Sequence, residues 1–426
     1  MNASASRRFS AVWSVVALLA TTAPLTAQDD AALIDNARAI HDRVMTLDTH
    51  VDINPANFTA ARSYATALET QVNVPKMEDG GLDAVFLIVY VGQDEDLTSA
   101  GFERAHATAM EKFDAIHRLV EELAPDRIGL ALTPDDARRI YASGKKVAFI
   151  GVENGYPLGD DIENVRRFAE LGARYVSLAH NGHSQLSDSN TGERDGVWLH
   201  GGLSPLGRQV VAELNRWGVM IDISHPSKQS MMQTVELSQA PIIASHSAVR
   251  ALCDHSRNMD DDQLRALAAN GGVIQVVAFS GYVKCGEDSP ERQQAVAALR
   301  ERFAITGGGR GAMASLTDEQ RAEYQRAMQQ INRDFPPPPR ATVQDFVDHI
   351  DYAVNLIGID HVGISSDFDG GGGVDGWNDA TETFNVTLEL VKRGYTEPQI
   401  EKLWSGNLLR VLGEVQEAGR RIREGM

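Results

Sequence analysis

A histidine and an aspartate stand two residues apart at the end of an apolar, strand-like segment. In the stretch TLDTHVDI, residues 46–53, they are His50 and Asp52. Side chains at positions i and i+2 of an extended strand point the same way, so both can reach one metal ion. A buried histidine hydrogen-bonded to a nearby carboxylate would give the same short pattern. The rest of the chain must decide between these two interpretations.

Eight apolar runs rich in Val, Ile and Leu recur along the 426 residues, and most are separated by stretches with helical periodicity. They span 44–50, 82–90, 146–153, 174–180, 218–225, 241–246, 271–279 and 361–369. Strands that are apolar throughout and alternate with helices favour a parallel sheet covered on both faces. Eight such units predict an α/β fold, a single (β/α)8 TIM barrel. An open doubly wound sheet is the competitor, but it expects a glycine-rich turn where this chain reads HVDINPAN.

Residues that could bind a metal fall at the ends of six of these runs. They are His50 and Asp52, then Glu153, His180, His225, His246 and Asp367. In a barrel, the chemistry collects at the C-terminal ends of the strands, where the βα loops converge. Structural roles would scatter such groups between both ends, and burying them without a cation would be costly. The pattern therefore predicts a metal site.

The ligand types indicate which metal. Imidazoles and carboxylates without a thiolate suit Zn²⁺, with manganese, cobalt or iron as substitutes. Five ligands are too many for one tetrahedral catalytic zinc that keeps a water, and about right for two ions that share a carboxylate. The run 174–180 has no lysine that could serve as a carboxylated bridge. Glu153 lies between the two pairs of remaining ligands, and we expect it to be the bridge.

The N-terminal segment, the net charge and the cysteines indicate where the protein acts. Residues 1–27 have the layout of a secretory signal peptide, with two arginines, the apolar run AVWSVVALLA and then small residues. We expect residues 28–426 to form the mature metallo-hydrolase domain, exported and either periplasmic or secreted. A net charge of −19 argues against nucleic acid or an anionic membrane surface as a partner. Only Cys253 and Cys285 are present, and they could form a disulfide or be two buried free thiols.

Residues 281–340 interrupt the repeat between the seventh and eighth runs. This insertion holds a glycine cluster, a polar helix from about Thr317 to Phe335 and then four prolines. Thr317 with Gln320 predicts a capping box for that helix. The insertion could be a lid over the mouth of the barrel or a solvated decoration far from it.

Taken together, the motifs resemble the membrane dipeptidase, or renal dipeptidase, family of zinc dipeptidases, which are amidohydrolase-like barrels. The resemblance runs from about residue 35 to 415. It is carried by HVD (50–52), GVENG (151–155), SLAHN (177–181), DISHPS (222–227), ASHS (244–247), SRNMDD (256–261), GISSDFDG (363–370) and GNLLRVL (406–412). Each motif is weak alone, but their order is highly specific.

The resemblance implies a metal-ligand set. His50 and Asp52 would bind one zinc, His225 and His246 would bind the other, and Glu153 would bridge them. The chain would then hold two Zn²⁺ ions.

The resemblance also implies substrate contacts and a disulfide. His180 would contact the scissile carbonyl side of the substrate and Arg257 its carboxylate. Asp367 would be the catalytic aspartate, acting together with Glu153 at the catalytic centre. Because the family's vertebrate members pair the equivalent cysteines, it implies a Cys253–Cys285 disulfide. The chain departs from those members in lacking a membrane-anchor signal and in its longer insertion.

The expected function is hydrolysis of free dipeptides, including those with a D-residue at the second position. The expected partner is therefore a small dipeptide, with no nucleic acid and no stable membrane span, and the chain could be a monomer or a homodimer. A related metal-dependent hydrolase of N-acyl amino acids, lactones or β-lactams is one alternative. An exported metal- or solute-binding protein without activity is a second, and a cell-envelope interaction module built on the insertion is a third.

Overall fold

The computed structural model describes Met1 and residues 27–94, 97–305 and 316–426. The predicted signal peptide, apart from Met1 and Ala27, and the glycine cluster of the insertion lie outside these residues. Within the described ranges, no helix is both long and apolar enough to cross a membrane.

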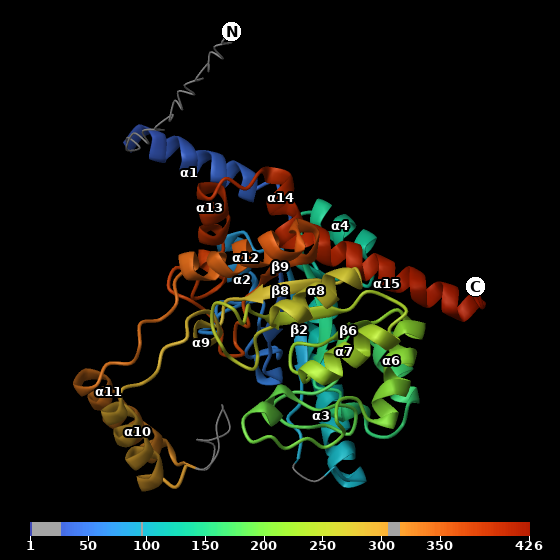
Figure 1. The fold of residues 1–426 in the computed structure, drawn as a ribbon, viewed down its shortest axis with the longest axis horizontal. Helices are drawn as coiled ribbons and strands as arrows, with labels where there is room; N and C mark the ends of the chain where they lie inside the picture. The colour runs from blue at the N-terminus through green and yellow to red at the C-terminus, as the bar shows by residue number, and fades with distance from the viewer. Residues whose placement is uncertain (2–26, 95–96, 306–315) are drawn as a thin grey trace.

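Eight parallel strands form the predicted barrel (Figure 1). They are β1 Leu47–Asp52, β2 Ala84–Tyr90, β4 Lys146–Glu153, β5 Ala173–Ser177, β6 Met220–Asp222, β7 Ile243–Ser247, β8 Val273–Val277 and β9 Val362–Ser365, each paired with the next. The seam between the first and last strands is bridged where the Asp52 N–H donates to the Phe368 carbonyl at 2.9 Å. Each predicted run overlaps one of these strands, so the (β/α)8 prediction is confirmed. A ninth strand that was not predicted, β3 Ile128–Leu130, pairs with β4 outside the barrel path.

Helices surround the barrel, apart from α10 and α11 of the insertion. They are α1 Ala27–His41, α2 Val74–Gly80, α3 Ser99–Arg118, α4 Pro134–Ala142, α5 Glu163–Glu170, α6 Pro205–Trp217, α7 Lys228–Leu237, α8 Asp261–Ala269, α9 Ser280–Val283, α10 Pro290–Arg302, α11 Asp318–Asp334, α12 Val343–Ile357, α13 Phe384–Lys392, α14 Glu397–Glu401 and α15 Asn407–Glu424. Their ends follow local rules. For example, the Ser204 hydroxyl caps α6, Pro205 is its first residue, and Gly218 ends it at φ 69°.

The last helix closes the N-terminal end of the barrel. Leu408 and Leu412 of α15 belong to the same buried cluster as Leu47, Ala84 and Val147, which stand at or near the starts of their strands. Because apolar side chains fill this end, the polar side chains that the strands carry must gather at the opposite, C-terminal end.

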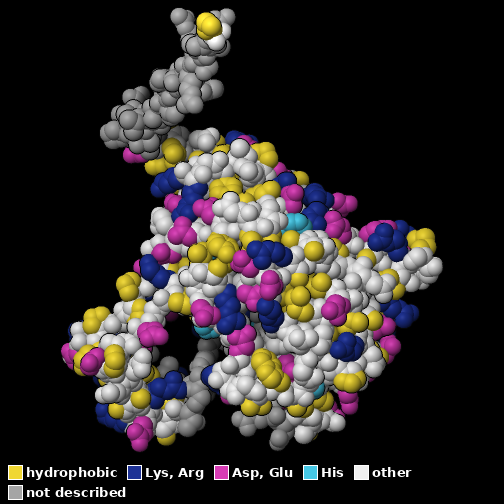
Figure 2. Space-filling view, viewed as in Figure 1, with side chains coloured by type: hydrophobic (Ala, Val, Ile, Leu, Met, Phe, Trp, Pro, Cys, Tyr) yellow, Lys and Arg dark blue, Asp and Glu magenta, His cyan; other side chains and the backbone are white. Residues whose placement is uncertain are grey.

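The insertion between β8 and β9 forms a helical hairpin beside the barrel. α10 and α11 pack on each other, with the rings of Phe303 and Tyr324 5.6 Å apart. The predicted capping box of α11 is present, since Thr317 and Gln320 exchange both hydrogen bonds. The hairpin projects from the body of the molecule as a separate lobe (Figures 1 and 2).

A disulfide joins Cys253 to Cys285, whose Cα atoms are 5.1 Å apart, so the expected pairing is confirmed. It connects the loop after β7, which carries Arg257, to the segment that follows α9. The Asn258 side chain adds a second connection, because its Nδ2 donates to the carbonyls of Cys253 and Tyr282, each at 2.8 Å.

His349 of α12 provides a test of how burial couples stability to pH. Its Nδ1 accepts the Val249 N–H at 3.0 Å and its Nε2 donates to the Val283 carbonyl at 2.8 Å. Burial lowers the pKa of His349 from 6.5, against the opposing effect of the Val283 carbonyl. Below about pH 6.5 the unfolded chain therefore binds a proton that the folded chain does not bind. The free energy of unfolding consequently decreases as the pH is lowered.

We expect His349→Gln to be less stable than the wild type at pH 7.5, by about 1–3 kcal/mol. That gap should narrow by up to about 1.4 kcal/mol per pH unit as the pH falls through 6.5, because only the wild type carries the titrating group. Urea unfolding of both proteins at pH 7.5, 6.5 and 5.5 measures the gap. A gap that stays constant would contradict the assignment of a neutral, buried His349.

Candidate metal centre

The structure brings all seven predicted metal-site residues together at the C-terminal end of the barrel. Two of them lie within strands before the final residue, two end strands and three lie just beyond strands. His50 and His246 are within β1 and β7, Asp52 and Glu153 end β1 and β4, and His180, His225 and Asp367 follow β5, β6 and β9. Convergence of parallel strands at one edge thus places side chains that are far apart in the sequence around one point.

Glu153 is at the middle of the cluster, and its two carboxylate oxygens face different histidines. Oε1 lies 3.0 Å from Nε2 of His225 and 3.3 Å from Nε2 of His246. Oε2 lies 3.5 Å from Nε2 of His50. The same Oε1 is 3.6 Å from Nε2 of His180. One carboxylate therefore faces His50 with one oxygen and His225 and His246 with the other.

Among the described residues, three groups of three side chains have ligand atoms within 4.8 Å of one another. They are His50, Glu153 and His246; Glu153, His180 and His225; and His50, Asp52 and Asp367. His180 and Asp367 therefore lie as close to the cluster as the residues expected to bind metal. Proximity by itself does not separate metal ligands from residues that contact the substrate.

The donor set is suited to a cation. Nε2 of His225 and Nε2 of His246 are 3.0 Å apart, and both face the same oxygen of Glu153. Nε2 of His50 is buried and has no hydrogen-bond partner among the described residues. Ring nitrogens and carboxylate oxygens that converge in a buried place are unfavourable unless a proton or a cation lies between them. The residues present therefore fit a bound metal.

The shifted pKa values of the cluster also favour a bound cation. Burial would lower the pKa of His50, but the carboxylates of Glu153, Asp367 and Asp52 outweigh it and raise the pKa to about 9. Burial would raise the pKa of Glu153, but the neighbouring histidines, first His180 and His50, hold it well below its usual value. The carboxylates thus attract positive charge to this point, which a metal ion can supply in place of a proton.

Asp367 adopts a left-handed backbone conformation at φ 59°, a few residues before a run of glycines. A Cβ on Gly370 would lie 1.9 Å from Oδ1 of Asp367 and 2.5 Å from Oδ2 of Asp52. Only a glycine lets the main chain pass so close to both carboxylates. Burial raises the pKa of Asp367 well above its usual value, although His50 opposes the shift. These features are typical of a strained, functional turn.

Arg257 lies beside the cluster and is 3% exposed. Its Nη1 donates to the Ser224 carbonyl and its Nη2 donates to the His246 carbonyl at 3.1 Å. The guanidinium is 5.4 Å from the centre of the Tyr282 ring. A guanidinium has five N–H donors, so these two carbonyls do not use all of them.

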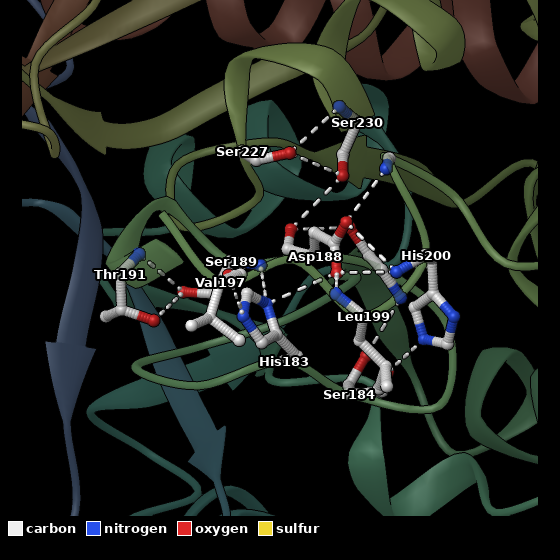
Figure 3. A network of polar contacts seen from close by, with 12 residues as sticks. His183, Ser184, Asp188, Ser189, Thr191, Val197, Leu199, His200, Ser227 and Ser230 are labelled. Carbon is white, nitrogen blue, oxygen red and sulfur yellow. Dashed lines mark hydrogen bonds and ion pairs between the residues drawn. The ribbon is translucent and has the colours of Figure 1, made fainter. Parts of the chain in front are cut away.

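The loop after His180 is held by a buried carboxylate (Figure 3). Asp188 accepts the N–H groups of Leu199 at 2.8 Å and of Gly202 at 2.9 Å. The hydroxyl of the next residue, Ser189, donates to the carbonyl of His180. The loop therefore fixes the main chain of His180 at the rim of the site.

The sequence reasoning missed several side chains that contact the cluster. The rings of Tyr90 and His180 are 4.6 Å apart, and Tyr175 and Ser245 hydrogen-bond to the rings of His50 and His246. The sequence held signals for two of them. Ser245 belongs to a Ser-His pair that occurs at the ends of two successive runs, and Tyr175 is a polar-tipped aromatic residue in the run RYVSLAH.

Comparisons with known proteins agree with the geometry. Residues 34–425 match the family described as membrane dipeptidase (peptidase family M19). Dipeptidase tcpJ of Claviceps purpurea (strain 20.1) is 32% identical over 354 residues, which are 82% of this chain and 70% of that protein.

Solved structures are also similar. The crystal structure of the probable dipeptidase PvdM from Pseudomonas aeruginosa is 35% identical with a TM-score of 0.78, covering 91% of this chain and 99% of that one. A metallo peptidase from Rhodobacter sphaeroides, liganded with a phosphinate mimic of the dipeptide L-Ala-D-Ala, has a TM-score of 0.66, covering 87% of this chain and 99% of that one. At 21% identity, the second likeness shows the shared fold alone.

Proposed function

The chain belongs to the membrane dipeptidase family, peptidase family M19, and from this membership we propose that it is a binuclear zinc dipeptidase that hydrolyses free dipeptides. Members of this family are metallopeptidases, and dependence on zinc is general among them. The observation that carries the proposal is the placement of Glu153, one oxygen toward His50 and the other toward His225 and His246. A carboxylate in this position can bridge two ions.

Each ion then has its own residues. His50 and Asp52 would hold one zinc, His225 and His246 would hold the other, and Glu153 would be shared by both. When bound, two zinc ions supply a water of lowered pKa near neutral pH and polarise the scissile carbonyl. The chain's other residues bind and orient the dipeptide and move its protons.

Asp367 takes the proton from the attacking water and delivers it to the leaving amine. The raised pKa of its carboxyl group suits a residue that must accept and release a proton. His180, held at the rim by its loop, donates to the oxyanion that forms at the scissile carbonyl.

Arg257 holds the carboxylate of the dipeptide through its remaining N–H donors. Fixing that carboxylate at a set distance from the metals restricts cleavage to short substrates. We expect Arg257→Lys to raise the KM for a dipeptide by about 10–100-fold, because a lysine lacks the planar fork. Metal content should be unchanged.

The matched control for this change lies in the substrate. A dipeptide amide lacks the carboxylate, so the wild type should prefer the free acid and Arg257→Lys should lose that preference. Steady-state kinetics on both substrates measures it. An equal loss on the acid and the amide would contradict the role of Arg257 in holding the carboxylate.

The proposed function is tested by initial rates of the zinc-loaded protein on L,L and L,D dipeptides, a tripeptide and N-acetylated amino acids. Cleavage confined to free dipeptides is the expected result, and we propose that L,D dipeptides are among those cleaved. Turnover of acylated substrates alone would favour the related hydrolase of N-acyl amino acids.

We also propose that residues 1–27 are removed during export and that residues 28–426 work outside the cytoplasm. The Cys253–Cys285 disulfide supports this proposal, because disulfides persist in oxidising compartments. N-terminal sequencing of the protein recovered from the periplasm or the medium tests it, and a mature chain that keeps residues 1–27 would contradict it.

A further inference from the structure

Two histidines of the metal centre rest on buried hydroxyl groups. Nδ1 of His50 lies 2.9 Å from the Tyr175 hydroxyl, and Nδ1 of His246 lies 2.7 Å from Oγ of Ser245. All four residues are buried. Solvent therefore does not compete at these contacts, and each hydroxyl decides which nitrogen of its histidine carries the proton.

The direction of the bond to His50 follows from the other partner of Tyr175. The Tyr175 hydroxyl donates its single proton to the Thr49 carbonyl at 3.2 Å. Its oxygen is then available only as an acceptor, so Nδ1 of His50 must be the donor. The lone pair of a neutral His50 is thereby left on Nε2, the atom that faces Glu153.

The direction of the hydrogen bond to His246 follows from the Asp222 carboxylate, which is connected to Ser245 through Ser224. Oδ1 of Asp222 accepts the N–H groups of Ser224 and Ser245 at 3.1 and 2.7 Å, and also accepts the Ser224 hydroxyl at 2.9 Å. Having given its proton to Asp222, Ser224 accepts from the Ser245 hydroxyl at 3.3 Å. The oxygen of Ser245 then accepts from Nδ1 of His246, and the lone pair of that ring is also left on Nε2.

The barrel interior keeps the Tyr175 hydroxyl in place. Gly151 is the register partner of Tyr175 on β4, and a Cβ there would lie 2.3 Å from the tyrosine ring. Phe86 stacks on the same ring at 5.2 Å. The glycine at position 151 thus leaves space for the Tyr175 ring, and Phe86 packs against it.

We propose that Tyr175 and Ser245 are positioning residues that fix His50 and His246 with their protons on Nδ1, so that both Nε2 atoms are directed at the metals. The inference rests on the proposed function and adds to it. His225 lacks such a partner among the described residues, since its Nδ1 is buried without a hydrogen bond. The two fixed rings belong to different ions in the proposed ligand set, so each hydroxyl serves one ion.

The test is metal affinity, measured on metal-free protein by competition with a chelator for Zn²⁺ and Co²⁺. Tyr175→Phe removes the hydroxyl and keeps the ring, and we expect it to weaken one of the two binding steps by about 10–100-fold. Ser245→Ala should weaken the other step by a similar factor. The visible absorption of the Co²⁺ protein should change in both variants, because a ligand ring that can rotate alters the coordination geometry.

Tyr64→Phe is the matched control. Its ring is buried and stacks on Phe58 at 5.0 Å, and its hydroxyl has no hydrogen-bond partner among the described residues. This variant loses the same group without removing a hydrogen bond to a histidine of the metal centre, so its metal affinity should equal that of the wild type.

The outcomes separate the inference from the function on which it rests. Wild-type affinity in Tyr175→Phe and Ser245→Ala, with or without lower thermal stability, would overturn the positioning role and leave the proposed function intact. A wild-type protein that binds neither Zn²⁺ nor Co²⁺ would overturn both. If Tyr175→Phe does not fold, the metal affinity of Ser245→Ala still tests whether a hydroxyl fixes the tautomer of His246.

Discussion

Asp367→Asn is expected to lower kcat for dipeptide hydrolysis by about 10²- to 10⁴-fold while both metal ions stay bound. Asparagine has nearly the shape of aspartate but cannot take a proton from water at neutral pH. The left-handed turn at Asp367 tolerates asparagine, so the main chain should keep its position. Steady-state kinetics and metal analysis of the same sample measure the two parts of this prediction.

The metal analysis decides between two roles for Asp367. Its Oδ1 lies 4.0 Å from Nε2 of His50, close enough for the side chain to belong to a metal-binding group. If Asp367→Asn loses a metal ion together with activity, the residue is a ligand and its role in proton transfer is wrong. If it keeps both ions and full activity, it has neither role.

Asp369→Asn is the control for Asp367→Asn. Asp369 belongs to the same loop and has the same left-handed conformation, at φ 58°. Its carboxylate accepts the N–H groups of Gln71 and Val72 at 3.0 and 3.2 Å instead of facing the metal centre. This variant should keep its kcat close to that of the wild type, even if its stability falls.

Glu153→Gln is expected to lose metal binding and activity together. Changes to residues that only orient ligands cost about 10–100-fold in metal affinity, so loss of the bridging ligand itself should cost more than about 100-fold. An amide also removes the negative charge that offsets the positive ions in a buried place. Fewer than two zinc ions per chain after dialysis, with a matching loss of turnover, is the expected result.

Glu170→Gln provides the comparison for Glu153→Gln. Glu170 pairs with Arg166 on the outer face of α5, where its side chain is 57% exposed. The same chemical change there should leave metal content and turnover unaffected. Retention of both zinc ions by Glu153→Gln would contradict the bridging role, and the family resemblance would then have misplaced the bridge.

The sequence predicted the barrel because its signals are local and repeated. Each apolar run marks a buried strand, and the ends of parallel strands must share one edge. His50, Glu153, His180, His225 and His246 could therefore be placed together without coordinates. The capping box of α11 was also predicted, since it depends on residues three apart in one helix.

Other features stayed open in the sequence because they depend on distant segments. The short strand β3 forms by pairing with β4, outside the barrel path. The residues alone allowed Cys253 and Cys285 to be either a disulfide or two free thiols; the family resemblance favoured a disulfide, and the fold brings the two cysteines together.

The chain by itself thus determined which residue types meet at the end of the barrel, and the tertiary structure decided how they face one another. The ladder between β1 and β2 shifts register between Asp48 and Val51, so alternation along the strand does not fix where His50 points. The hydroxyl that orients His50 comes from Tyr175, 125 residues away. Side-chain direction in a closed barrel depends on register and on contacts across its interior. The periodicity of a single strand determines neither of them.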